Sequence, residues 1–147
     1  MPNNTTKRFL FLCTGNSCRS QMAEGWARHL LGDVIESFSA GVEKHGLDPI
    51  AVEVMGEADV DISNHKSKLI SELADLDFDY VITLCDNARQ TCPFFPGTTK
   101  NIHIGFDDPR SLTSASNTSR EEKLKTYRRV RDEIRKMIDD LPRSLGL

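Results

Sequence analysis

A polar stretch at residues 13–20, Cys-Thr-Gly-Asn-Ser-Cys-Arg-Ser, constrains the fold of this chain more than any other feature. It follows an apolar run at residues 9–12, which predicts a buried strand, and precedes residues 21–31, which predict an amphipathic helix. The chain therefore has to turn sharply from the end of a strand into the start of a helix. At such a turn the first N–H groups of the helix lack partners within it, and the helix dipole attracts negative charge. We therefore expect this loop to bind an anion.

Strands and helices are expected to alternate along the rest of the chain. The further strands predicted are residues 34–40, 78–84 and 101–104. The further helices predicted are one that starts at Pro49 with Asp48 as N-cap, one over residues 66–76, and one from a capping box at residues 119–122 to about Leu141. Residues 86–99 are expected to form a loop. This alternation predicts an α/β fold, a central parallel sheet of about four strands with helices on both faces.

Length and charge limit the classes of protein to which the chain can belong. Its 147 residues suit one domain over residues 1–147, with a frayed tail at residues 1–6. The net charge of -3 gives no support for nucleic-acid binding. No apolar run approaches the ~20 residues of a membrane span, and the N-terminus does not resemble a signal peptide. We therefore expect a cytoplasmic protein, a monomer, that binds neither nucleic acid nor membrane.

The four cysteines, Cys13, Cys18, Cys85 and Cys92, are not spaced as ligands of a structural metal. None of them forms a Cys-x-x-Cys pair, and thiols in a cytoplasmic protein are normally reduced. The four histidines also lack the spacing of metal ligands. We expect no bound metal and no bound cofactor.

The loop at residues 13–20 has the residues of a nucleophilic site for a tetrahedral oxyanion. Arg19 follows Cys13 by six positions, and its guanidinium can bind two oxygens in a fork, while positive surroundings favour the Cys13 thiolate. Gly15 lets the backbone curl, and Asn16 tolerates a left-handed conformation. The candidate oxyanion-binding residues are Thr14, Gly15, Asn16, Ser17, Cys18, Arg19 and Ser20. A buried cysteine beside a surface arginine is the alternative, which fits poorly between a strand and a helix.

Cys85 and Cys92 lie far along the chain, the first at the end of a predicted strand and the second in a polar loop beside Pro93. Ligands of parallel sheets bind at the carboxyl ends of the strands, so we expect Cys85 near the loop that begins at Cys13. A disulfide between Cys85 and Cys92 needs Cα atoms within ~7 Å, so the intervening loop must contract. We favour a redox relay over two buried core thiols. For Cys18 we favour a structural or modulating role over a redox role.

Asp107 and Asp108 precede Pro109 at a third expected exit from the sheet. An Asp-Pro pair commonly makes a solvated turn. Beside an oxyanion site, one of the two carboxyl groups can instead protonate a leaving oxygen. We therefore expect one of them to act as a general acid, and the residues alone leave open which one.

These segments together resemble a known family. Residues 13–26 are similar to the active-site loop and first helix of thioredoxin-coupled arsenate reductases, which share the fold of low-molecular-weight protein tyrosine phosphatases. The similarity continues, in order, through residues 39–41, 45–46, 61–65, 83–85, 92–93, 105–109 and 129–134. Both groups carry Cys-x5-Arg-Ser, so the loop alone does not separate a reductase from a phosphatase. The pair Cys85 and Cys92 favours the reductase.

The resemblance implies a relay of three cysteines that serves arsenic detoxification. Cys13 attacks arsenate held by the loop amides and Arg19. Cys85 then attacks Cys13, arsenite leaves, and a transient Cys13–Cys85 disulfide forms. Cys92 attacks Cys85 and leaves the final Cys85–Cys92 disulfide, which thioredoxin reduces. The resemblance thus implies electrons from thioredoxin, and phosphate or sulfate as competing oxyanions.

The resemblance also assigns supporting roles and leaves alternatives. Asp108, directly before Pro109, would protonate the departing oxygen, and Ser20 would stabilise the Cys13 thiolate. The main alternative is a low-molecular-weight protein tyrosine phosphatase that hydrolyses phosphomonoesters, and weak phosphatase activity is expected in either case. A redox-sensing binding module without turnover is a third possibility. Glutaredoxin is an alternative electron donor, but a dithiol such as thioredoxin resolves an intramolecular disulfide alone.

The chain departs from the family at one position. Family members that bind a structural potassium use residues matching Asn16, Glu24 and Ser39 together with an aspartate, and here Lys68 stands in place of the aspartate. Its ammonium group either replaces the potassium and pairs with Glu24, or points to solvent. The first arrangement implies an activity that is insensitive to potassium.

Overall fold

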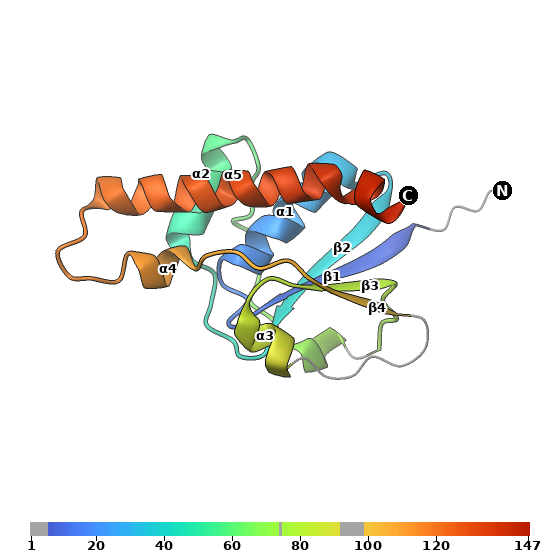
Figure 1. Ribbon diagram of the computed structural model, residues 1–147. Coiled ribbons are helices and arrows are strands. Elements are labelled where there is room, and N and C mark those ends of the chain that lie inside the picture. The colour runs from blue at the N-terminus through green and yellow to red at the C-terminus, as the bar shows by residue number, and fades with distance from the viewer. Residues whose placement is uncertain (1–5, 74, 92–98) are drawn as a thin grey trace.

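One parallel sheet organises the computed structural model, which describes residues 6–73, 75–91 and 99–147 (Figure 1). Its strands are β1 (Lys7–Cys13), β2 (Ile35–Gly41), β3 (Tyr80–Thr83) and β4 (Lys100–His103), in the order β2-β1-β3-β4. All neighbouring strands are parallel. Strand β1 is central and leads directly into the loop at residues 13–20, as the sequence predicts.

Helices cover both faces of the sheet (Figure 1). Helices α1 (Arg19–Leu31), α2 (Pro49–Glu57) and α5 (Arg120–Leu145) lie on one face. The 3-10 turn η1 (Ile70–Leu73) and helix α3 (Asp86–Thr91) lie on the other, while the short α4 (Pro109–Leu112) precedes α5. The predicted α/β fold is therefore confirmed. No helix in the described part of the chain is long and apolar enough to cross a membrane.

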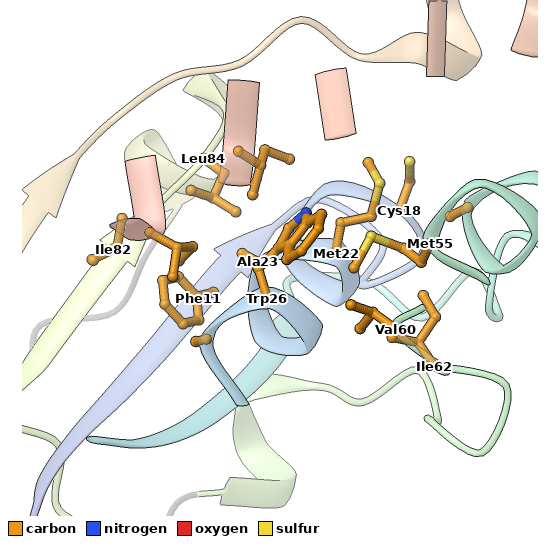
Figure 2. Close-up of a cluster of buried hydrophobic side chains, with 14 of the residues drawn as sticks. Phe11, Cys18, Met22, Ala23, Trp26, Met55, Val60, Ile62, Ile82 and Leu84 are labelled. Carbon is orange, nitrogen blue, oxygen red and sulfur yellow. The ribbon is translucent and has the colours of Figure 1, made fainter. Parts of the chain in front are cut away.

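Strand β1 is buried on both faces, because its side chains alternate between two hydrophobic clusters. Phe9 and Phe11 belong to the cluster under α1, α2 and α5. Leu10 and Leu12 belong to the cluster on the opposite face. Figure 2 shows part of the first cluster, where Trp26 of α1 lies among the aliphatic side chains. This packing fixes the end of β1, from which the loop departs.

Two helix starts occur where the local sequence predicts them. The Asp48 carboxylate accepts from the Ile50 N–H at 2.9 Å, with Pro49 as the first helical residue. The Ser119 hydroxyl accepts from the Glu122 N–H at 3.1 Å. Helix α5 continues past the predicted end at Leu141 and stops at Gly146, which has φ of 70°.

Two other predictions are wrong in part. The helix expected over residues 66–76 is only the single turn η1, because the backbone before it bonds to other segments: Lys68 N–H donates to Asn16 and Lys68 O accepts from Gly41. The loop expected over residues 86–99 begins instead with helix α3. Ala88 in α3 is fully buried, and the apolar contact of α3 with the sheet explains why a polar segment is helical.

Candidate active site

The backbone of the loop at residues 13–20 turns its carbonyl groups outward. The carbonyl oxygens of Thr14, Gly15 and Ser17 accept from backbone N–H groups of the segment at residues 43–48, at 2.8, 3.0 and 3.0 Å. Because a trans peptide is planar, the N–H that follows each carbonyl points the opposite way. Several N–H groups therefore face the inside of the loop, and such an arrangement binds anions.

Asn16 and Gly15 give the loop its shape in different ways. Asn16 has φ of 48°, the left-handed conformation that the sequence predicts for it. Gly15 lies in the same bend without a positive φ. It is needed for close approach, because a Cβ atom there would lie 2.2 Å from Nδ1 of His45.

The nucleophile candidate Cys13 is buried and contacts Ser20, with 2.9 Å between Sγ and Oγ. Ser20 Oγ also accepts from Asn16 Nδ2 at 2.8 Å. The amide of Asn16 cannot be reversed, because its Oδ1 accepts from the Lys68 backbone N–H at 2.7 Å. The Ser20 proton therefore remains to be donated to Cys13. Ser20 is thus placed to donate to Cys13, the contact that the role implied for Ser20 requires.

Arg19 and Asp108 come together although they lie far apart in the sequence. Arg19, the first residue of α1, is 8% exposed and donates to the carbonyl of Phe106 at 3.0 Å. Its other terminal nitrogen lies 3.6 Å from Asp108 Oδ2. The Asp108 carboxylate caps α4, accepting from the Arg110 N–H at 3.0 Å and from the Ser111 hydroxyl at 3.0 Å. The structure thus holds a carboxyl group beside the loop arginine.

Cys85 lies beside the same loop. Its Sγ is 3.3 Å from Thr14 Oγ1, and the Ala88 N–H of α3 points at it from 3.4 Å. Cys13 and Cys85 belong to one buried cluster on this face of the sheet. The expected proximity of Cys85 to the loop is therefore observed, whereas Cys92 lies outside the described residues.

A cavity of about 390 Å³ opens where these groups meet. It is lined by Arg19, Cys85, Asp86, Gly105, Phe106, Asp107 and Asp108. A second cavity of about 400 Å³ lies beside Ser17 and Tyr127, but neither Arg19 nor Cys85 lines it. The smaller cavity is therefore the candidate active site.

Cys18, in contrast, faces the core. It is 4% exposed and lies near Met22 and Met55 (Figure 2). Burial, reinforced by the negative charge of Asp48, raises the pKa of the Cys18 thiol well above its ordinary value. A thiol that stays protonated is a poor nucleophile, so the environment fits a structural role.

Lys68 extends toward the position where the resemblance places a potassium ion. Its Nζ lies 3.9 Å from Glu24 Oε1, the atom that also accepts from the Ser39 hydroxyl at 2.5 Å. Burial lowers the pKa of Lys68 while Glu24 opposes that shift. No cluster of three or more His, Cys, Asp or Glu side chains in the described ranges has the arrangement of a metal site.

Comparison with known proteins places this fold and loop in a family. Residues 8–146 match the family model of the low molecular weight phosphotyrosine protein phosphatases. The chain belongs to this family. Several similar members of the phosphatase-like family are arsenate reductases. The arsenate reductase of Bacillus subtilis (strain 168) is 50% identical over 128 residues, which cover 87% of this chain and 89% of that protein.

Two further comparisons agree. The arsenate reductase of Staphylococcus aureus (strain N315) is 46% identical over 133 residues, which cover 90% of this chain and 94% of that protein. A solved structure of an arsenate reductase in the phosphate binding state superposes with a TM-score of 0.75 at 31% identity. The superposition covers 95% of this chain and 99% of that one. The fold of the family is thus shared along nearly the whole length.

Proposed function

We propose that this member of the family reduces arsenate to arsenite through a relay that begins at Cys13. One observation carries the proposal: a second buried thiol, Cys85, lines the same cavity as Arg19 and Asp108 and lies 3.3 Å from the hydroxyl of Thr14. Hydrolysis of a phosphate ester requires only the first thiol, an arginine and an acid. Reduction requires a second thiol that reaches the first.

The substrate is bound by charge and by backbone donors. The inward N–H groups of the loop and the Arg19 guanidinium supply donors for the oxygens of arsenate. Phosphate and sulfate have the same tetrahedral shape, so they should compete with arsenate. The relative solved in a phosphate binding state supports this choice of ligand class.

The first chemical step forms a bond between sulfur and arsenic. The Cys13 thiolate attacks arsenic, aided by the hydrogen bond from Ser20, and an oxygen protonated by Asp108 leaves as water. The Cys85 thiolate then attacks Cys13 Sγ and breaks the S–As bond. The bonding electron pair goes to arsenic, which leaves as arsenite, and a Cys13–Cys85 disulfide remains. Arsenic gains two electrons and the two thiols lose two.

The final step transfers the disulfide to Cys92, whose role rests on its place in the sequence. Cys92 attacks Cys85, frees the Cys13 thiolate and leaves a Cys85–Cys92 disulfide. We propose thioredoxin as its reductant, because a dithiol reduces an intramolecular disulfide without a further thiol. A cytoplasmic setting, where thiols are kept reduced, fits this cycle.

A coupled assay tests the proposal. Thioredoxin, thioredoxin reductase and NADPH are mixed with the protein, and NADPH oxidation is recorded with and without arsenate. Arsenate-dependent oxidation with release of arsenite is the expected result, with slower or no turnover when glutaredoxin and glutathione replace thioredoxin. Flat traces under all conditions would instead favour a binding module. Weak hydrolysis of an aryl phosphate is expected as a side activity of the shared oxyanion site.

A further inference from the structure

We propose that Gln21 and His65 form a positioning pair that holds in place a hydrogen-bond chain ending at Cys13. The inference deepens the proposed function, because it concerns the nucleophile of that relay. The reactivity of Cys13 is nevertheless measurable without arsenate or thioredoxin, so the inference and the relay can fail separately.

The orientation of Gln21 follows from what surrounds its side chain. Gln21 is completely buried in the first turn of α1. Its Nε2 faces three oxygen atoms: Asn16 O at 3.1 Å, Asn16 Oδ1 at 3.0 Å and Lys66 O at 3.0 Å. All three are acceptors, so the NH2 group of the amide has to face them. The Oε1 atom is therefore turned to the opposite side.

His65 Nδ1 lies on that opposite side, 3.0 Å from Gln21 Oε1. An amide oxygen only accepts, so Nδ1 has to carry a hydrogen and donate it. The three acceptors on the NH2 side and the His65 N–H on the oxygen side therefore favour the same orientation of the Gln21 amide, and His65 holds the amide oxygen from outside the loop.

Gln21 in turn holds Asn16 where its side chain reaches Ser20. Asn16 has the left-handed φ of 48°, and Gln21 donates to both its backbone and its side-chain oxygen. With Oδ1 occupied, Asn16 Nδ2 donates to Ser20 Oγ, and the Ser20 proton is directed to Cys13 Sγ. The chain of donors therefore runs from His65 through Gln21, Asn16 and Ser20 to the sulfur.

The direction of this chain is preserved when His65 titrates. Burial lowers the pKa of His65, with Glu24 and Asp61 opposing the shift and Arg28 and Lys68 adding to it. The neutral Nδ1–H tautomer and the imidazolium both keep the hydrogen that Gln21 accepts. The pair therefore acts through donor geometry, and the pH dependence to be measured belongs to the thiol.

The test is the pH profile of iodoacetamide alkylation at Cys13, read by peptide mass spectrometry. His65→Phe removes the donor, and Gln21→Met removes both hydrogen-bonding groups at similar volume. Both should move the midpoint of the profile up by about one pH unit, because the charge-assisted hydrogen bond from Ser20 to Cys13 is weakened. Below the midpoint, such a shift lowers the fraction of thiolate about tenfold. His65→Asn keeps an N–H donor and should restore the wild-type midpoint. His29→Phe makes the same change at an exposed histidine of α1 that is not part of the hydrogen-bond chain, so it is the matched control for His65→Phe.

Two results would overturn the inference. One is a wild-type midpoint in His65→Phe when circular dichroism shows that the variant is folded. The other is an equal shift in His65→Phe and His65→Asn, which would mean that the donor is not what matters. If the buried Gln21→Met variant does not fold, the two variants of the half-buried His65 decide the question.

Discussion

A glycine in helix α3 should speed the second half of the relay. Helix α3 occupies Asp86–Thr91, between the two cysteines of the proposed final disulfide. A helix rises about 1.5 Å per residue, so a chain that stayed helical from Cys85 to Cys92 would hold their Cα atoms about 10 Å apart. A disulfide requires Cα atoms within ~7 Å. Helix α3 therefore has to open before Cys85–Cys92 can form.

The exposed Gln90 is the position at which to test this. Glycine is about 1 kcal/mol less favourable than alanine within a helix. If opening precedes disulfide exchange, Gln90→Gly should form Cys85–Cys92 about fivefold faster than Gln90→Ala, since about 1.4 kcal/mol corresponds to tenfold. The pair is matched because both variants remove the same side-chain functional group.

The rate is measured in a single turnover with arsenate and without thioredoxin. Samples are quenched in acid, their free thiols are alkylated, and the conversion of the Cys13–Cys85 disulfide to Cys85–Cys92 is followed by mass spectrometry. Aryl phosphate hydrolysis, which requires no movement of α3, should be the same in both variants. Equal conversion rates, or a slower rate for Gln90→Gly, would refute the requirement for opening.

Three other predictions concern single side chains. Asp108→Asn should lower aryl phosphate hydrolysis by about 10²–10⁴, with the larger losses for poor leaving groups, because a general acid is removed; a loss independent of leaving group in steady-state assays would argue against that role. Wild-type arsenate turnover should be equal in sodium and potassium chloride, whereas Lys68→Asp should make kcat/KM rise with potassium; a potassium response of the wild type would show that the ammonium does not replace the ion. Cys18→Ala should retain turnover, and peptide mapping at pH 8 should find Cys13 alkylated but not Cys18, because burial raises the pKa of Cys18; loss of turnover in a folded variant would give Cys18 a chemical role.

Local signals predicted the fold where local contacts decide it. Asp48 and Ser119 cap their helices through residues two and three positions away, so short sequence patterns were sufficient. The alternation of strands and helices likewise predicted the parallel sheet and the place of the loop at the end of β1.

Contacts between distant segments were not predictable in the same way. The segment before η1 is not helical, although its sequence pattern is, because the backbone of Lys68 forms hydrogen bonds with other segments. Its N–H donates to Asn16, and its carbonyl oxygen accepts from the Gly41 N–H. The close approach of His45 to Gly15 was not predicted, because His45 comes from a different part of the chain. A polar residue is ordinary in an amphipathic helix, so the sequence did not identify Gln21 as a site residue. Only the structure reveals its contact with His65.

The most direct test of the central claim is a comparison of two activities in Cys85→Ser, with Cys18→Ser as the matched control. Arsenite production in the thioredoxin-coupled assay and hydrolysis of an aryl phosphate are measured on the same preparations. The relay predicts that Cys85→Ser loses arsenite production while it retains hydrolysis, because Cys13, Arg19 and Asp108 are intact. Arsenate turnover that survives in Cys85→Ser would contradict the relay.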